Sequence, residues 1–345
     1  MKKNSKKIIV GITCGDLNGI GMEVILKTFA DKRMFDFCTP VIFGSSKSTA
    51  FHNKILKKKT TFNLVSKINN LNEKQLNILN CWNEDIKINL GENSANIGKY
   101  AYISLEKAKE SLENNQIDVL VTPPINKYAI QKNNPNFIGH TEYLEKKFKG
   151  KSLMMMISDS MKISFVTSHV PLSKVSSLIT KKKIIEKIKI LNTSLIKDFG
   201  LIKPKIAVLG LNPHAGEDGI LGLEEIEIIT PAINELKENH KIFVYGPFPA
   251  DSFFSLKNIK KFDGILSMYH DQGLTAFKSL SFLDGVNYTA GLNIIRTSPV
   301  HGTGFDIAGK NIALEDSFRK SVFIACDIIK KRKMFYELNE KSTNS

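Results

Sequence analysis

The chain has 345 residues, of which 42% are hydrophobic, and carries a formal net charge of +15. A chain of this length typically forms about two domains, and no apolar run approaches the ~20 residues that a membrane helix needs. The cations are almost all lysines, in short runs without interleaved aromatic residues, so the charge does not indicate a nucleic-acid partner.

The first predicted element is a strand over residues 7–13. The basic residues before it lead directly into a short apolar stretch without a small-residue cleavage site, which indicates a strand and not a signal peptide, so we expect a cytoplasmic protein. The turn Gly15-Asp-Leu-Asn-Gly-Ile-Gly follows and opens a helix predicted over residues 21–30. Its backbone N–H groups would suit a phosphate or carboxylate, but glycines that close a tight turn explain it equally well.

Further along, strand-like and helix-like runs alternate, which predicts an α/β sheet protein. The remaining strands are predicted at 40–44, 117–122, 162–168, 205–211, 241–245 and 263–268. The remaining helices are predicted at 96–114, 141–148, 181–198, 222–239 and 314–331. Residues 51–90 are polar and weakly patterned, and they indicate a peripheral insertion with a strand near 61–65. Residues 336–345 are predicted to form a disordered tail.

Three of the seven histidines, His169, His214 and His270, lie just past strand-like runs. Ligands of open α/β sheets bind at the carboxyl ends of strands, and neutral imidazole is the commonest ligand of zinc-class ions. The spacings of 45 and 56 residues match no local zinc motif. The fold would therefore have to assemble a catalytic metal site, and three unrelated loop histidines remain the alternative.

Several charged and polar residues accompany these histidines. Lys278, Asn287 and Arg296 follow His270 at intervals of eight to nine residues, and a guanidinium fork beside an ammonium suits a phosphate or carboxylate substrate. Asp251 and Asp271 lie in the neighbouring segments, where each could orient a ligand histidine or move a proton. Surface positions are the alternative for each residue taken alone.

Two further segments could bind anions or a nucleotide. In Gly139-His140-Thr141-Glu142, Thr141 is expected to cap a helix whose N–H groups would then face an anion; a plain capping box is the alternative. The loop at 300–310, Val-His-Gly-Thr-Gly-Phe-Asp-Ile-Ala-Gly-Lys, has three glycines that permit close backbone approach. Asp306 in this loop could accept a hydrogen bond from a ribose hydroxyl, although an irregular connection explains the loop equally well.

Together these segments resemble one family, the 4-hydroxythreonine-4-phosphate dehydrogenases of bacterial pyridoxal phosphate synthesis. The resemblance is carried by Gly15-Asp-Leu-Asn-Gly-Ile-Gly-Met-Glu, Gly139-His-Thr-Glu-Tyr-Leu, Thr167-Ser-His-Val-Pro-Leu, Leu211-Asn-Pro-His-Ala-Gly-Glu, Gly246-Pro-Phe-Pro-Ala-Asp, Met268-Tyr-His-Asp-Gln-Gly and Gly291-Leu-Asn-Ile-Ile-Arg-Thr-Ser. The 300–310 loop is also similar to the NAD-binding loop of isopropylmalate and isocitrate dehydrogenases. Leu17-Asn18 and Met22 depart from the family pattern in the first turn.

The resemblance implies roles for individual residues. It implies metal ligands at His169, His214 and His270, and substrate contacts at His140, Thr141, Lys278, Asn287 and Arg296. Together with the observations above, we expect catalytic roles for Lys278, Asp251 and Asp271, and cofactor contacts at Gly15, Asp16, Gly302, Thr303 and Asp306. The resemblance also implies NAD or NADP and one divalent ion, with zinc, magnesium, manganese and cobalt left open. In this family a homodimer completes the site, so His270 is expected to reach the metal of the partner subunit.

The implied reaction is oxidative decarboxylation of 4-phosphohydroxy-L-threonine to 3-amino-2-oxopropyl phosphate with NAD, a step of pyridoxine 5'-phosphate synthesis. The alternatives are a related dehydrogenase of another phosphorylated hydroxy acid, and a non-catalytic binding protein of the same fold. The implied fold has two α/β/α domains of the isocitrate and isopropylmalate dehydrogenase type, with the active site in the cleft between them. The first is expected to comprise residues 1–125 and 275–335, and the second, which carries the metal ligands and the dimer contact, residues 126–274.

Overall fold

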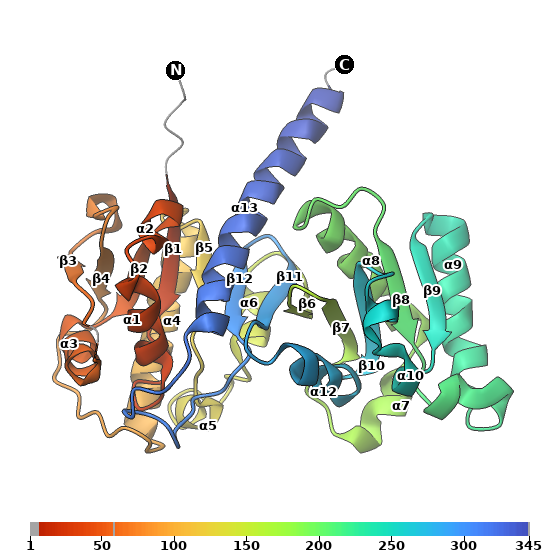
Figure 1. Cartoon of the computed structure of the whole chain (residues 1–345), viewed down its shortest axis with the longest axis horizontal. Coiled ribbons are helices and arrows are strands. Elements are labelled where there is room, and N and C mark those ends of the chain that lie inside the picture. Colours follow the sequence, from red (N-terminus) through yellow and green to blue (C-terminus); the bar gives the residue numbers. More distant parts are fainter. Residues whose placement is uncertain (1–6, 58, 344–345) are drawn as a thin grey trace. The chain divides into compact units, whose positions relative to one another are not determined.

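The computed structural model describes residues 7–57 and 59–343, and the chain divides into two compact units (Figure 1). The first unit comprises Met1–Phe148 and Ile294–Ile329, and the second comprises Lys149–Asn293 and Lys330–Ser345. Both units thus take residues from two stretches of the chain. The sequence predicts boundaries at 125/126 and 274/275, whereas the structure has them about twenty residues later in each case.

The first unit is built on six parallel strands in the order β3-β4-β2-β1-β5-β12. These strands are β1 (Ile8–Thr13), β2 (Cys38–Gly44), β3 (Phe62–Val65), β4 (Leu76–Asn80), β5 (Val119–Val121) and β12 (Arg296–Pro299). Its helices are α1 (Gly21–Ala30), α2 (Met34–Phe37), α3 (Ser46–Ile55), α4 (Ala95–Glu113), α5 (Lys127–Gln131), α6 (His140–Lys147) and the first part of α13 (Asp316–Thr343). Every residue of β2 is buried, as expected for a parallel strand covered on both faces.

The second unit has six strands in the order β11-β6-β7-β10-β8-β9. They are β6 (Gly150–Ile157), β7 (Lys162–Thr167), β8 (Lys205–Leu209), β9 (Phe243–Phe248), β10 (Gly264–Tyr269) and β11 (Val286–Leu292). The longer helices are α8 (Lys181–Lys197), α9 (Thr230–His240) and α12 (His270–Ser281), and short ones are α7 (Val175–Leu178), α10 (Ala250–Phe253) and α11 (Leu256–Ile259). Strands β7, β10, β8 and β9 are parallel, while β6 is antiparallel to both β7 and β11.

Helix α8 shows how the sequence pattern positions an element of the second unit. Its residues Ile184, Ile188, Leu191 and Leu195 are buried, and this spacing places them on one side of a helix. The helix begins where the hydroxyl of Thr180 accepts a hydrogen bond from the N–H of Lys183, at 3.3 Å, which is the usual role of an N-cap threonine.

Two predictions about the periphery of the chain have different outcomes. The strand predicted near 61–65 is confirmed as β3, and residues 51–90 lie at the edge of the first unit's sheet, where β3 and β4 extend it in parallel beyond β2. The predicted disordered tail, 336–345, is helical as far as Thr343 because α13 continues through it, and residues 344–345 lie outside the described residues.

A buried ionic network fixes the later part of α13 within the second unit. The Arg332 guanidinium donates from Nε to Oδ1 of Asp198 at 2.6 Å and from Nη2 to the hydroxyl of Tyr288 at 2.8 Å. The Tyr288 hydroxyl donates to Oδ2 of Asp198 at 2.7 Å. All three side chains are buried, so their charges and polar atoms satisfy one another away from water.

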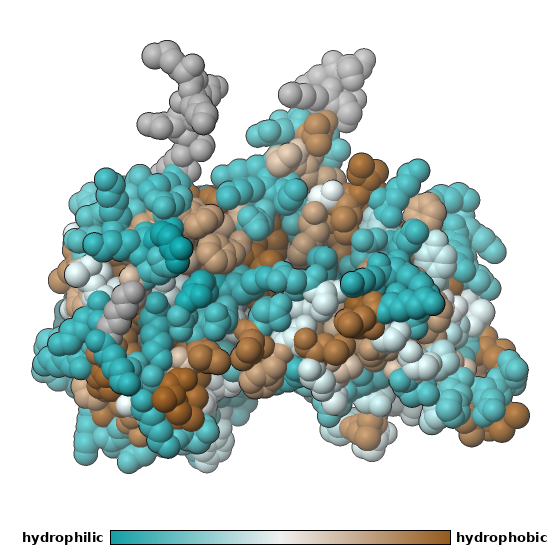
Figure 2. All heavy atoms as spheres, viewed as in Figure 1, coloured by the Kyte–Doolittle hydropathy of each residue, from teal (hydrophilic) through white to brown (hydrophobic). Residues whose placement is uncertain are grey.

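The described residues include no helix that is long and apolar enough to cross a membrane. On the face drawn in Figure 2, hydrophilic residues dominate the surface and hydrophobic side chains are scattered among them. This distribution agrees with the absence of a long apolar run in the sequence.

Candidate functional site

The three histidines lie at one edge of the second unit's sheet. His169 follows β7, His214 follows β8 and His270 follows β10, and these neighbouring strands are parallel in the order β7-β10-β8. Their carboxyl ends therefore meet at the same edge. The rings of His169 and His270 have centroids 5.8 Å apart.

Carboxylates accompany two of these histidines, as the sequence suggests. Nδ1 of His270 lies 2.6 Å from Oδ1 of Asp271, within hydrogen-bond distance. Nδ1 of His214 lies 3.7 Å from Oδ2 of Asp251, which is an ion-pair distance but too long for a hydrogen bond. A carboxylate on Nδ1 leaves Nε2 as the ring nitrogen for a metal, and this pairing is usual for metal-binding histidines.

The imidazole nitrogens of His169, His214 and His270 are suitable donors for a divalent metal. Neutral imidazoles oriented by carboxylates are the common ligand set of zinc-class ions. Between residues 7 and 343, residue 58 excepted, no three His, Cys, Asp or Glu side chains come close enough to hold an ion. The side chain of His214 is 63% exposed and that of His270 is 28% exposed, so both are accessible from outside the chain.

Two candidate substrate residues lie in the same unit. Lys278 is on α12, eight residues after His270, which is about 12 Å along a helix. Asn287 is on β11, and its Oδ1 is buried without a hydrogen-bond partner among the described residues. A buried amide oxygen without a partner is costly, so a ligand that donates a hydrogen bond there would remove this cost.

In the first unit the structure brings Arg296 and His140 together. Arg296, the first residue of β12, is only 4% exposed. It donates to the hydroxyl of Thr122 from Nε at 2.9 Å and from Nη2 at 2.6 Å, and Nη2 lies 3.2 Å from Nδ1 of His140. The sequence did not single out Thr122, although it ends a predicted strand just before Pro123-Pro124.

The protonation of His140 follows from this contact. A guanidinium can only donate, so Nδ1 of His140 must accept and Nε2 must carry the ring proton. Burial lowers the pKa of His140 well below its usual value, and the charges of Arg296 and Lys127 lower it further. Burial also lowers the pKa of Arg296 to about 10, so a charged guanidinium and a neutral imidazole N–H are both present at neutral pH.

The capping role predicted for Thr141 is wrong. Helix α6 begins at His140, its N-cap is Gly139, and no side chain caps it. The extended backbone of Gly139 starts the helix one residue earlier than predicted. Thr141 therefore lies in the first turn, directly after His140.

The first turn and the 300–310 loop lie together in the first unit. The N–H of Ile20 donates to the carbonyl of Thr303 at 2.9 Å, and a Cβ on Gly19 would lie 2.6 Å from the same oxygen. Asp306 is exposed, and a Cβ on Gly302 would have no heavy atom of the described residues within 4 Å. The predicted cofactor residues of the two segments are therefore neighbours, with Gly302 and Asp306 at the surface.

The backbone of the first turn hydrogen-bonds within the protein. The N–H of Asp16 donates to the carbonyl of Pro124, that of Asn18 to Oδ1 of Asp16, and that of Gly19 to the carbonyl of Asp16. Gly15 has φ +67°, and a Cβ there would lie 2.8 Å from the carbonyl oxygen of Pro124. The glycines thus serve to close a tight turn, the second of the two interpretations that the sequence allows.

Asp16 makes the stability of the first unit depend on pH. Its side chain is 2% exposed, and burial raises its pKa from 3.8 to about 6. Because the pKa is higher in the folded chain, the folded chain keeps this proton to a higher pH than the unfolded chain does. The contribution of the protonated Asp16 to the free energy of unfolding is present below the unfolded pKa and is lost as pH rises through about 6. Asp16→Asn should therefore raise the unfolding free energy at pH 7.5 by up to about 3 kcal/mol and leave it nearly unchanged at pH 3.5. Urea titrations at the two pH values measure this difference, and an equal effect at both would contradict it.

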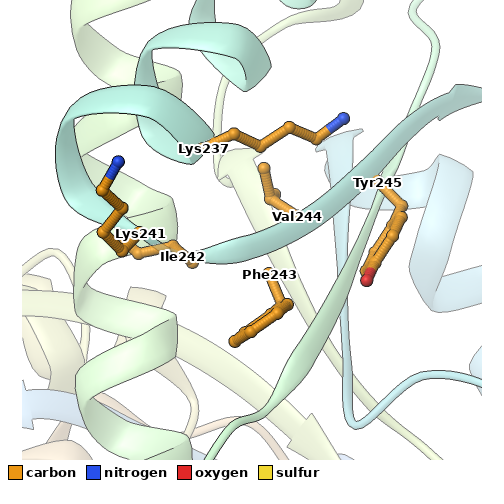
Figure 3. Close-up of a pocket in the computed structure, with 6 residues that line it drawn as sticks. All are labelled: Lys237, Lys241, Ile242, Phe243, Val244 and Tyr245. Carbon is orange, nitrogen blue, oxygen red and sulfur yellow. The ribbon is translucent and has the colours of Figure 1, made fainter.

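The pocket drawn in Figure 3 contains none of the predicted site residues. It has a volume of about 330 Å³ and is lined by Lys237, Lys241, Ile242, Phe243, Val244 and Tyr245. Phe243 and Tyr245 point to one side of β9 and Val244 to the other, as alternation along a strand requires. The candidate metal-binding histidines lie elsewhere, after the carboxyl ends of β7, β8 and β10.

Comparison with known proteins identifies the family. The family model described as "Pyridoxal phosphate biosynthetic protein PdxA" matches residues 36–325. The 4-hydroxythreonine-4-phosphate dehydrogenase of Bacteroides thetaiotaomicron is 48% identical over 328 residues, covering 94% of this chain and 90% of that protein. A protein of Oceanobacillus iheyensis, provisionally named D-threonate 4-phosphate dehydrogenase, is 38% identical over 330 residues, covering 94% of this chain and 98% of that protein.

Solved structures confirm the fold class. The 4-hydroxythreonine-4-phosphate dehydrogenase of Klebsiella pneumoniae matches with a TM-score of 0.80 and 29% identity, over 95% of this chain and 99% of that one. The isocitrate dehydrogenase of Methylococcus capsulatus matches with a TM-score of 0.50 and 11% identity, over 94% of this chain and 87% of that one, a likeness of fold alone. The chain belongs to the pyridoxal phosphate biosynthetic protein PdxA family, as its sequence motifs predict.

Proposed function

We propose that the protein is an NAD-dependent 4-hydroxythreonine-4-phosphate dehydrogenase of the cytoplasm. It oxidises the 3-hydroxyl of 4-phosphohydroxy-L-threonine, and the β-keto acid then loses CO2 to give 3-amino-2-oxopropyl phosphate for pyridoxine 5'-phosphate synthesis. The observation that carries the proposal is 48% identity, over 94% of the chain, to a dehydrogenase of that name.

The anionic groups of this substrate call for cations and N–H donors. In the first unit, the buried guanidinium of Arg296 and the Nε2–H of His140 supply them, and Thr141 adds a hydroxyl in the first turn of α6. In the second unit, Lys278 contributes an ammonium and the partnerless Oδ1 of Asn287 accepts from an N–H or O–H of the substrate. Burial makes such charged hydrogen bonds stronger than they are in water.

The histidine edge of the second unit is suited to the oxidation itself. Nε2 atoms of His169, His214 and His270 would hold the divalent ion, which supplies positive charge for the oxygen anion that develops during oxidation and decarboxylation. Asp271 orients the ring of His270 through Nδ1, while Asp251 lies 3.7 Å from Nδ1 of His214, and each is placed to move a proton.

NAD accepts the hydride, and the 300–310 loop, which lies beside the first turn, is suited to hold it. Asp306 at the surface of this loop can accept from a ribose hydroxyl, while Gly302 leaves space for a nucleotide to approach. Gly15, Asp16 and Thr303 shape the same region. A carboxylate at this position suits the uncharged ribose of NAD better than the 2'-phosphate of NADP, because like charges repel.

The active unit is proposed to be a homodimer with shared metal sites. No three metal-binding side chains cluster within the described part of one chain, and His214 and His270 are accessible from outside it. A second chain that supplies His270 would complete the set beside His169 and His214.

A second candidate is a dehydrogenase of D-threonate 4-phosphate, which the relative of Oceanobacillus iheyensis favours. The two substrates share the phosphate and the hydroxyl and differ at the carbon next to the carboxylate, where one has an amine and the other a hydroxyl. Formation of NADH from each compound at equal concentration separates the candidates. The proposal expects faster turnover of 4-phosphohydroxy-L-threonine, and exclusive turnover of D-threonate 4-phosphate would overturn it.

Arg296→Lys tests the anion contact in the first unit. Lysine keeps the charge but cannot donate to Thr122 and a substrate anion in the same planar geometry. We expect the transition-state stabilisation measured by kcat/KM to fall by roughly 1.5–3 kcal/mol, the range for a hydrogen bond to a charged group. Steady-state kinetics with the phosphorylated substrate measure the loss, with Arg33→Lys, an exposed arginine, as the control. Wild-type kinetics in Arg296→Lys would exclude the contact.

A further inference from the structure

The loop that carries His214 has a backbone that needs support. Residues 214–218 have φ values of 52°, 53°, 84°, 42° and 54°, and only Gly216 among them is a glycine. The left-handed conformation costs an L-residue roughly 1–2 kcal/mol, so four such residues persist only where their surroundings hold them.

The side chain that holds this loop is Glu225, which is only 3% exposed. Its Oε1 accepts from the N–H of Leu211 at 2.7 Å and from the N–H of Asn212 at 2.8 Å. Its Oε2 accepts from Nδ2 of Asn212 at 2.9 Å. Three N–H donors on one buried carboxylate make strong hydrogen bonds, and all of them come from the two residues that lead into Pro213 and His214.

The carboxylate also fills the inside of the loop. A Cβ on Gly210 would lie 3.0 Å from Oε1 of Glu225, and a Cβ on Gly216 would lie 2.7 Å from Oε2. These two glycines flank His214 on either side, and both approach the same carboxylate. The loop is therefore wrapped around Glu225, with the His214 side chain directed outward and exposed.

A second side chain ties the start of this loop to the strand that precedes His270. Nε2 of Gln272 donates to the carbonyl of Gly210 at 2.7 Å, and its Oε1 accepts from the N–H of Met268 at 2.7 Å. The ends of β8 and β10 are thereby linked. The His214 loop is thus held by Glu225 on its inner side and by Gln272, which links it to the end of β10.

We propose that Glu225 is a positioning residue that holds His214 in the geometry for metal binding. The inference rests on the proposed function, because it takes His214 as a ligand. Glu225 lies behind the loop, with both oxygens engaged by loop N–H groups, so it acts through the backbone and not on the ion. Without its carboxylate the loop relaxes from the left-handed conformation and His214 spends less time in place.

The test compares metal binding and loop protection in Glu225→Gln. Glutamine keeps the shape but turns an amide N–H toward loop donors, so it cannot accept all three hydrogen bonds. The controls are Glu227→Gln, an exposed glutamate two residues further along, and His214→Ala. Chelator-stripped protein is titrated with Co²⁺ and followed by its visible spectrum, and amide hydrogen exchange is measured on the same metal-free samples.

We expect Co²⁺ affinity to fall about 10-fold or more in Glu225→Gln, the usual effect of losing a group that supports a ligand. Exchange should become faster at residues 211–218 and stay unchanged in α8, and Glu227→Gln should behave as wild type. If Glu225→Gln shows faster amide exchange but unchanged Co²⁺ affinity, while His214→Ala binds Co²⁺ more weakly, the positioning role of Glu225 is refuted. The proposed function would not be affected by that result. Unchanged affinity in His214→Ala would remove His214 from the metal site, and the proposed function would lose that ligand together with this inference. If Glu225→Gln does not fold, Glu225→Asp, which withdraws the carboxylate but keeps its charge, gives the same comparison.

Discussion

Replacing His214 by alanine is expected to lower kcat/KM by three orders of magnitude or more, about 4 kcal/mol of transition-state stabilisation. The change removes one proposed ligand whose side chain is exposed at the end of β8, so the fold should remain intact. The remaining imidazoles would bind the ion weakly, and the charge that stabilises the developing oxygen anion would be lost. Steady-state formation of NADH, at fixed Mn²⁺ or Zn²⁺, measures the effect.

The matched control is His240→Ala, because His240 is an exposed histidine at the end of α9. It should retain wild-type kinetics. Wild-type enzyme stripped with a chelator should resemble His214→Ala and recover when a divalent ion is added. Full turnover after verified removal of the metal would contradict the metal-based mechanism.

Arg332→Leu is expected to lower the unfolding free energy by about 3–5 kcal/mol, the usual cost of removing one partner of a buried ion pair. The change leaves the carboxylate of Asp198 buried without its cationic partner, with hydroxyl donors from Ser194 and Tyr288. Urea unfolding followed by circular dichroism measures the loss. The single tryptophan, Trp82, belongs to the first unit, so its fluorescence would not report on this network directly.

Two further variants separate the ion pair from side-chain size. Lys333→Leu changes the exposed neighbour on α13 and should alter the unfolding free energy by less than about 0.5 kcal/mol. Arg332→Leu combined with Asp198→Asn should recover part of the loss, because no uncompensated charge then remains buried. A double variant that is less stable than Arg332→Leu would contradict this explanation.

Elements with a clear hydrophobic period could be predicted from the sequence, and others could not. Helix α1 occupies the predicted 21–30, because a glycine-rich turn precedes it and apolar residues fill it. The sequence pattern does not predict strand β4, because the polar Asn77 is its second residue. This asparagine is fully buried, and its amide donates hydrogen bonds to the carbonyls of Pro40 and Asn72. The alternation of polar and apolar residues along the strand does not predict these hydrogen bonds. Strand β11 was missed in the same way, since Asn287, Thr289 and Gly291 interrupt its apolar run.

The chemistry of the site was more visible in the sequence than its support. Histidines after strand-like runs have a local signal, and parallel strands bring them to one edge. Thr122 has no such signal, because its contact with Arg296 joins residues 174 positions apart. Glu225 lies in a predicted helix with ordinary surface composition, and only the folded loop around it shows what it binds.

Mixing two inactive chains tests most directly whether the three histidines act as one metal site in this reaction. A His169→Ala chain paired with a His270→Ala chain forms one site without either ligand and one site with all three, if His270 crosses to the partner subunit. Random exchange makes about half of the dimers mixed, each with one good site, so about a quarter of wild-type NADH formation should return. No recovery, with subunit exchange verified by mass spectrometry, would contradict a site shared between two chains.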